Sequence, residues 1–191
     1  MYDNTILFTQ ALGIQHPWKI DEVKFDPKER QLDIYISNIG GIELPCPDCK
    51  QDSPVHDHVD ERTWRHLNFF QHKAFIHSRI PRVLCGKCAS IKQVEISWAR
   101  PRIGFTLLFE ALIMELAAHM PVKSIGELVD ENDTRLWRTI KHYVDEARAQ
   151  EDYSQVRQIG VDETSSRRGH NYPKIPTEIY NYTGSSTLNA L

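Results

Sequence analysis

Four cysteines are the residues whose spacing in this chain most directly suggests chemistry. They form two pairs, Cys46 with Cys49 and Cys85 with Cys88, each around two residues that include a turn former. A C-x2-C pair at a tight turn directs two thiolates to one point, and two such pairs complete a tetrahedral zinc site. All four positions of the ion would then be filled, so we predict a structural zinc. The alternatives are disulfides, which need an oxidising compartment, and a redox pair, which normally occurs singly in a βαβ setting.

The stretch "QIGVDETSSRRGH" places Asp162 at the end of a short apolar strand, predicted over residues 156–163. A carboxylate at this position suits Mg²⁺, which prefers oxygen ligands. Two-metal phosphoryl transfer needs at least two or three carboxylates that converge from separate strands. Glu163 would point to the opposite face of the strand, and Glu178 is the single later acid. The residues present therefore do not complete a catalytic set.

Charge is distributed unevenly along the chain. The 191 residues carry a formal net charge of −3, but residues 62–102 hold nine Lys or Arg against one acid, a net of +8. Aromatic and histidine residues are interleaved with these basic ones, which favours a surface for a polyanion over a merely solvated face. We therefore predict a nucleic-acid contact in this segment, with the candidate residues Arg62, Arg65, Lys73, Arg79 and Arg82.

The 35 residues between Cys49 and Cys85 are long for a simple zinc ribbon. "HVDERTWRHL" and "QHKAFIHSRIPRVL" read as two extended segments, which predicts a β-hairpin inserted between the cysteine pairs. We expect a zinc-binding finger over 41–100, with an N-terminal segment, 1–40, packed on it. Five histidines in the finger are alternative ligands, although surface or core positions suit them better: His56, His58, His66, His72 and His77.

Three helices are expected between residues 103 and 150. The run 105–120 predicts a mostly buried helix, 122–132 a short helix of about two turns, and 134–150 a third helix with Asp133 or Thr134 as its N-cap. The side chains expected to face inward are Leu107, Leu108, Ala111, Leu112, Met114, Leu116 and Ala118, then Ile125, Leu128 and Val129, then Leu136, Ile140, Tyr143, Val144 and Ala147.

Two helices joined by a tight turn are typical of a helix-turn-helix, whose second helix enters the major groove by its N-terminal residues. Arg135, Arg138 and Lys141 are then the candidate DNA contacts on the third helix. An ordinary three-helix bundle with a polar face produces the same pattern. The neighbouring cysteine module and basic segment favour the DNA-binding interpretation.

In chain order, "CPDC", "RTWRHLNFFQHKAFIHSRIPRVLCGKC", "WARP", "GFTLLFEALIMELAAHMPV", "DTRLWRTIKHYV" and "IGVDETSSRRGH" strongly resemble the bacterial insertion-sequence transposases of the ISL group. The resemblance implies a zinc finger, a helix-turn-helix and a DDE catalytic domain of ribonuclease-H type. It also implies recognition of the element's terminal inverted repeats. By the same resemblance, the four cysteines are the zinc ligands and Asp162 is the first acid of the DDE triad.

The resemblance stops near Tyr172, where the family continues into a second strand and the other two catalytic acids. We expect residues 156–172 to be the start of that domain and 173–191 to be an unrelated tail, in which Pro173 and Pro176 do not suit a central strand. A frameshift or an insertion would create such a junction. Translation of the downstream DNA in all frames would test this, since the hypothesis requires a family-like continuation there.

The expected fold is therefore α+β, with a zinc-knuckle β-hairpin module, a three-helix helix-turn-helix region and the first strand of an incomplete ribonuclease-H-like domain. The predicted function is that of a truncated transposase fragment that binds double-stranded DNA at element ends and lacks strand-transfer activity of its own. The alternatives are an active DDE transposase or nuclease completed by another chain, and a zinc-ribbon module that binds protein.

Zinc is the expected cofactor, and Mg²⁺ is expected only for a complete catalytic domain. Besides DNA, a second copy of the chain or a full-length transposase is a candidate partner. The longest apolar run is too short for a bilayer, and "MYDNTILFTQALG" has no basic region before its apolar residues. We therefore expect a cytoplasmic protein without a membrane partner.

Overall fold

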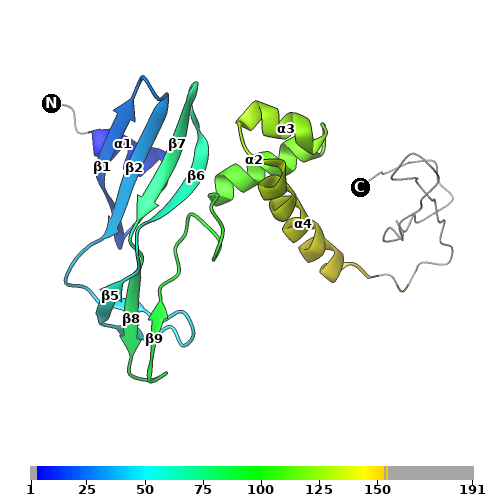
Figure 1. Ribbon diagram of the computed structural model, residues 1–191. Coiled ribbons are helices and arrows are strands. Elements are labelled where there is room, and N and C mark those ends of the chain that lie inside the picture. Colours follow the sequence, from blue (N-terminus) through cyan, green and yellow to red (C-terminus); the bar gives the residue numbers. More distant parts are fainter. Residues whose placement is uncertain (1–3, 153, 155–191) are drawn as a thin grey trace. The chain divides into compact units, whose positions relative to one another are not determined.

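The computed structural model describes residues 4–152 and residue 154 (Figure 1). The chain divides into two compact units, residues 1–141 and residues 142–191, and each is described by itself. The described part of the second unit continues helix α4 (Asp133–Gln150) from His142 onward. There His142 Nε2 lies 3.4 Å from a carboxylate oxygen of Glu146, one helical turn further on. The strand predicted over 156–163 and the tail over 173–191 lie outside the described residues.

Four strands of the first unit form one sheet in the order β1-β2-β7-β6. The antiparallel hairpins β1–β2 and β6–β7 are joined by a parallel pairing of β2 with β7. The hairpin predicted between the cysteine pairs is present as β6–β7, and the N-terminal hairpin extends its sheet (Figure 1). The strand bounds are Trp18–Asp26 for β1, Gln31–Asn38 for β2, Arg62–Phe69 for β6 and His72–Ser78 for β7.

Alternating apolar side chains give this sheet a buried face. On β2 the buried positions are Leu32, Ile34 and Ile36, two residues apart as the pleat of a strand requires. Trp64 of β6 and Ile76 of β7, which are register partners, continue that layer. Phe8 of helix α1 (Asn4–Ala11) and Leu12, which directly follows that helix, are partly buried against the same core. One face of the sheet is therefore packed against a hydrophobic core, which fixes the positions of its strand ends.

Short strands surround the cysteine pairs. A two-stranded sheet pairs β3 with β4, and a three-stranded antiparallel sheet has the order β5-β8-β9. Their bounds are Leu44–Pro45 for β3, Asp52–Ser53 for β4, Val55–His58 for β5, Pro81–Cys85 for β8 and Ser90–Gln93 for β9. Cys46 directly follows β3 and Cys85 ends β8, so strand ends position one cysteine of each pair.

Three helices follow the strands, as predicted: α2 (Leu107–Ala117), α3 (Val122–Val129) and α4. α2 begins two residues later than expected because Thr106 caps it, accepting a hydrogen bond from the Phe109 backbone N–H at its hydroxyl. The predicted caps of α4 were wrong. Asn132 takes that place, since its side-chain oxygen accepts the backbone N–H of Thr134 at 2.8 Å.

The predicted inward faces were partly wrong. Ile125, Val129, Leu136 and Ile140 are buried as expected, but the buried residues of α2 are Phe109, Glu110 and Ile113. α2 is apolar on most of its circumference, so its sequence does not fix which stripe faces the core. The predicted inward residues that are exposed are Leu107, Leu108, Ala111 and Ala118 on α2, Leu128 on α3, and Val144 and Ala147 on α4.

The segment before α2 joins the helices to the sheet. Phe105 forms a parallel bridge with Arg65 of β6, through backbone hydrogen bonds from Arg65 N–H to Gly104 and from Thr106 N–H to Arg65. His66 Nδ1 lies 2.9 Å from the Thr106 hydroxyl. The start of α2 is thus tied to β6. Within the described part of the chain, no helix is long and apolar enough to cross a membrane.

Candidate metal centre and nucleic-acid interface

The four cysteine sulfurs meet at one point. Their Sγ atoms all lie within 4.8 Å of one another, with 3.9 Å between Cys46 and Cys88 and 3.4 Å between Cys49 and Cys85. Sulfurs that surround a tetrahedral zinc at about 2.3 Å lie about 3.8 Å apart, so the cluster has the right size for the ion. The donor set fits a structural zinc. No histidine belongs to this cluster in the described part of the chain.

The two cysteine turns share one backbone feature. The residue after each second cysteine, Lys50 and Ala89, has a left-handed backbone with φ of 59° and 49°. In the first turn, Lys50 N–H donates to the Cys46 carbonyl at 2.9 Å. In the second, Cys88 N–H donates to the Cys85 sulfur at 3.4 Å. Two similar turns, carried by separate strand ends, therefore present their thiols to the same centre.

Without an ion, the thiols of this cluster do not all ionise. The Cys88 N–H is the main reason that the pKa of Cys85 falls to about 6. The pKa of Cys88 is raised to about 12, chiefly because its sulfur interacts with those of Cys49 and then Cys85. A divalent cation supplies the positive charge that allows four thiolates to lie together, and its binding releases protons.

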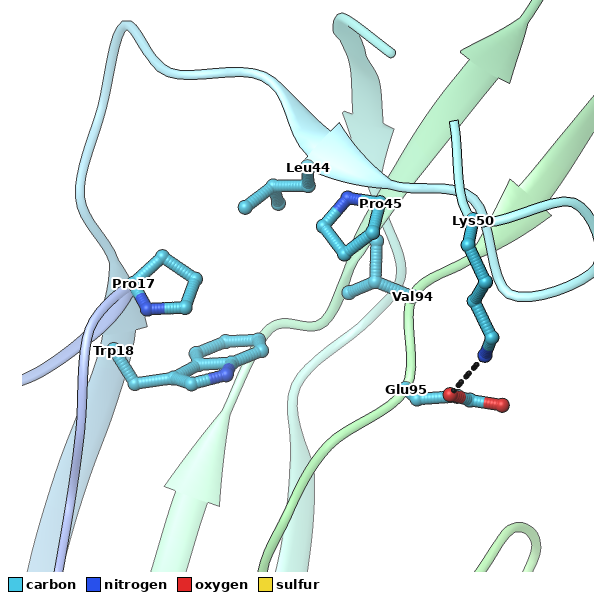
Figure 2. A pocket seen from close by; sticks show the side chains of 7 residues that line it. All are labelled: Pro17, Trp18, Leu44, Pro45, Lys50, Val94 and Glu95. Atoms are coloured by element: carbon cyan, nitrogen blue, oxygen red, sulfur yellow. Dashed lines mark hydrogen bonds and ion pairs between the residues drawn. The ribbon is translucent and has the colours of Figure 1, made fainter. Parts of the chain in front are cut away.

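A small cavity lies beside this cluster, between the start of β1 and the first cysteine turn (Figure 2). Its volume is about 90 Å³, and a Lys50–Glu95 ion pair of 2.8 Å lies at its edge. The other lining residues are apolar: Pro17, Trp18, Leu44, Pro45 and Val94. It is small for a substrate pocket, and we interpret it as a packing gap between the N-terminal hairpin and the cysteine module.

The turn between α3 and α4 is short and tight. Asp130, with φ of 53°, ends α3, and Glu131 N–H donates to the Gly126 carbonyl at 3.0 Å. A Cβ atom added at Gly126 would lie 2.6 Å from a carboxylate oxygen of Asp133 and 2.9 Å from the Glu131 carbonyl. The start of α4 therefore approaches α3 more closely than any side chain at residue 126 allows.

α4 presents a polar face on the side opposite its buried Leu136 and Ile140. Arg138 and Lys141 are exposed there, as the sequence predicted. Arg138 forms no ion pair with any residue that the structure describes. Trp137, 56% exposed, lies next to Arg138 and was missed. Its signal was its position directly after Leu136, because neighbouring residues lie about 100° apart around an α-helix.

Arg135 is held against the first unit's own residues. Its guanidinium bonds Glu131 at 2.5 Å and lies over the Phe105 ring, 4.3 Å from the ring centroid. One of its nitrogens also lies 3.4 Å from the Gly104 carbonyl. Although it is on the first turn of α4, its geometry is that of a residue that orients the helix.

The basic residues predicted on the hairpin differ in their surroundings. Arg79 is exposed, and Arg82 forms a two-pronged pair with Asp57, with Nε to Oδ1 at 2.6 Å. Lys73 pairs with Asp130. Arg62 donates to the Ile103 carbonyl at 3.2 Å and lies over the Trp64 ring.

Arg65 requires a correction. It was expected at a DNA surface, but it is 1% exposed, between the rings of Phe75 and Phe109. It donates to the Ala74 carbonyl at 3.2 Å, and its Nε lies 3.7 Å from Glu131. Burial lowers its pKa, and the charge of Glu131 partly opposes that shift. The basic pattern of the sequence did not show that the segment before α2 covers this position.

The predicted catalytic Asp162 lies outside the described residues, as do its neighbours Glu163 and Glu178. The region's expected Mg²⁺ chemistry therefore has no described geometry. The described site consists of the cysteine cluster and the α3–α4 region.

Comparison with known proteins covers both of these regions. Residues 43–88 match a family model described as the zinc-finger of transposase IS204/IS1001/IS1096/IS1165, and residues 94–144 match the helix-turn-helix domain of transposase family ISL3. The chain is 24% identical over 179 residues to the transposase for insertion sequence element IS1557 from two strains of Mycobacterium tuberculosis. That alignment covers 88% of this chain and 39% of the relative's length. No solved structure matches the chain.

The two matched models account for the two regions that the structure singles out. The zinc-finger match contains all four clustered cysteines, and the helix-turn-helix match contains α2, α3 and the part of α4 up to residue 144. The curated relatives, which align with most of this chain, are also named transposases. By these features the chain belongs to the ISL3 family of insertion-sequence transposases.

Proposed function

We propose that this chain binds duplex DNA at the terminal inverted repeats of its insertion element, with α4 in the major groove. In this proposal α3 and α4 are the helix-turn-helix pair and α2 is the third helix that supports them. The observation that carries it is the exposed face of α4, opposite the stripe that packs on α2 and α3. That face is formed by Thr134, Trp137, Arg138 and Lys141.

These four positions recur at intervals of three and four residues, so they lie along one side of the helix. Thr134 is on the first turn, where a recognition helix contacts base edges. Arg138 suits bidentate contact with guanine, and Lys141 suits a phosphate. Trp137 adds a large exposed ring that the core of the protein does not use. The face therefore contains the side-chain types that read and grip a duplex.

In the same proposal Cys46, Cys49, Cys85 and Cys88 hold a structural zinc. The cluster joins the strand ends of β3 and β8, which lie more than thirty residues apart in the chain. With four thiolate ligands the ion has no open position, so its role is to fix the fold.

We further propose that Asp162 is the first catalytic carboxylate, with Mg²⁺ as the ion it serves in a complete catalytic domain. The chain spans about 39% of the length of the curated relatives it matches. The 191-residue polypeptide tested by itself is expected to bind element ends and to leave them uncut.

The experiment is a gel shift with duplex that carries the element's inverted repeat, next to a scrambled duplex of equal composition. Zinc-loaded protein is expected to prefer the repeat, and a zinc chelator is expected to abolish that preference. Arg138→Ala should weaken binding by about 1–3 kcal/mol, the usual value of one good base contact. His119→Ala is the matched control, because His119 is exposed and lies in the connection between α2 and α3.

Mg²⁺ is included to detect nicked product. Nicking that Asp162→Ala abolishes would show an active site completed in some other way, such as by a second chain. Equal binding of both duplexes by parent and Arg138→Ala protein would contradict recognition by α4.

A second candidate function rests on a different observation. Leu84 of β8 and Ile91 of β9 are register partners, 47% and 43% exposed, on the outer face of the β5-β8-β9 sheet. Such a pair suits a protein contact of the zinc module. This function predicts no salt-dependent DNA affinity, whereas a phosphate-driven complex weakens steeply as salt rises.

A further inference from the structure

The turn region of the β6–β7 hairpin, residues 68–72, includes the end of β6 and the start of β7 and presents aromatic side chains to solvent. Phe70 is 80% exposed and Phe69 is partly exposed against it, with ring centroids 4.7 Å apart. Phe70 also has a left-handed backbone, with φ of 54°, a conformation that a bulky L residue adopts only at an energetic cost. Asn or Gly would fit this backbone better, and the core makes no use of the exposed ring. The aromatic residue at the tip therefore points to a ligand outside the fold.

This turn is attached to the connection between α3 and α4. Lys73, just past the turn, forms an ion pair with Asp130, and Arg65 on the preceding strand faces Glu131 at 3.7 Å. Asn68 in the turn accepts a hydrogen bond from Arg65, which links the tip to the same network. Two ion pairs thus hold the hairpin tip beside the residues that lead into α4.

The charges around the tip suit a polyanion. The acids of the α3–α4 turn are neutralised, Asp130 by Lys73 and Glu131 by Arg65 and Arg135. The β1–β2 turn lies at the same end of the sheet, since Lys73 N–H donates to the Arg30 carbonyl at 2.9 Å (Figure 1).

That neighbouring turn adds basic groups. Lys28 and Arg30 are exposed and form no ion pair with any residue that the structure describes. Of the two acids in this turn, Asp26 accepts the backbone N–H groups of Lys28 and Glu29, and Glu29 is exposed. The end of the sheet therefore offers two free cations next to an exposed ring.

We propose that the 68–72 turn is a second DNA contact, in which Phe70 enters a groove beside the site read by α4 and wedges against a base step. Lys28 and Arg30 then lie along the adjoining phosphates. Apolar side chains inserted in this way unstack a base step and bend the duplex, and basic side chains supply the salt-dependent part of the affinity. This inference rests on the proposed DNA-binding function and adds a second contact to it.

The test uses duplexes in which the element's inverted repeat is flanked on both sides by native sequence. 2-Aminopurine is placed at successive steps of the flanks, because its fluorescence rises when a base is unstacked. Parent protein is expected to raise the fluorescence at one step. Phe70→Ala should abolish that rise, weaken binding about tenfold, as expected for one lost aromatic stack, and leave the salt slope unchanged. Arg30→Ala should instead reduce the salt slope by about one.

Phe70→Asn introduces a residue that tolerates the left-handed backbone, so this variant should fold even if Phe70→Ala does not. It is expected to behave as Phe70→Ala does in the DNA assays. Leu108→Ala, at an exposed leucine on α2, is the matched control and should bind as the parent does. Zinc content and melting temperature are compared for every variant.

Parent affinity and parent fluorescence in both Phe70 variants, with binding weakened in Arg138→Ala, would overturn the second contact and leave the proposed function standing. Unchanged binding in Arg138→Ala as well would overturn both. A dimer that forms without DNA and disappears in both Phe70 variants, seen by sedimentation equilibrium, would assign the turn to self-association and overturn the inference.

Discussion

The cysteine cluster and the turn between α3 and α4 are both tight connections that position a functional element, but they are held in different ways. In the cluster, the four side chains that would do the chemistry also hold the turns together. At the α3–α4 turn, the supporting residues are buried, among them Arg65 and Gly126, whereas the residues proposed to contact DNA are on the opposite face of α4. Function and support coincide in one region and are separated in the other. Mutations should therefore affect the two regions differently.

The largest effect is expected in the cluster. Cys49→Ser removes one of four ligands, and because zinc binding contributes on the order of 10 kcal/mol in small zinc domains, the zinc-dependent fold should be lost. Zinc content by atomic absorption and a melting curve measure this. His56→Ala, at an exposed histidine of the same module, is the control. One tightly bound zinc per chain in Cys49→Ser protein would show that another residue can complete the site.

At the α3–α4 turn, Glu131→Leu is expected to cost about 3 kcal/mol of unfolding free energy, because it leaves the buried Arg65 cation without its acid. The double variant Arg65→Met with Glu131→Leu removes both charges and should recover most of that loss. Urea denaturation of the two single variants and the double variant gives the coupling energy. Additive losses would mean that the two side chains do not stabilise each other.

Gly126→Ala should destabilise the same turn by about 1 kcal/mol. The added Cβ meets the Glu131 carbonyl, and the strain of overpacking, about 1–3 kcal/mol, outweighs the better helix propensity of alanine, about 1 kcal/mol. Gly40→Ala, where nothing lies within 4 Å of the new atom, is the control. A melting temperature for Gly126→Ala at or above that of Gly40→Ala would contradict the close approach.

A further effect, which depends on pH, concerns the joint between β6 and α2. Burial, followed by the charge of Arg65, lowers the pKa of His66 to about 4. Because the folded pKa is depressed from 6.5, His66 contributes stability that is complete above pH 6.5 and is lost as pH falls towards 4.

His66→Gln removes this titration and should flatten the pH dependence between 6.5 and 4 by about 1–3 kcal/mol. The relevant quantity is the difference in unfolding free energy between variant and parent, because acid release of zinc is common to both. The exposed His119→Ala serves as control. A constant difference across this pH range would show that the pKa of His66 is the same in the folded and unfolded protein.

The two regions also differ in what their sequences reveal. The metal cluster could be predicted from spacing, since each C-x2-C turn brings its own two thiols together and the two turns meet in one cluster. The residues that support α4 could not be predicted from spacing. The burial of Arg65 depends on a segment some forty residues later, where Phe105 bridges to it. In a basic stretch of sequence, a basic residue is predicted to be exposed unless the segment that packs over it is known.

The helices show a similar limit. Their number and order were predictable, and so was the buried stripe of α4 in the first unit, because polar residues surround Leu136 and Ile140. The buried stripe of α2 was not, because leucines occur all around it and the Thr106 cap and the Phe105 packing select the phase. Asn132 as the cap of α4 is within one residue of the expected position, which local sequence seldom resolves.

The parallel pairing of β2 with β7 determines the order in which this protein can fold during synthesis. Gln31 pairs with Lys73, so β2 has no partner on that side until more than forty further residues have left the ribosome. Until then the β1–β2 hairpin has an open edge, and closing the connection costs chain entropy. Cys46 and Cys49 leave the ribosome before Cys85 and Cys88. A zinc ion bound first by Cys46 and Cys49 would gain its remaining two ligands later, and completion of the zinc site would bring together the strands that flank the hairpin. Metal supply would then govern the rate of folding as well as the final stability.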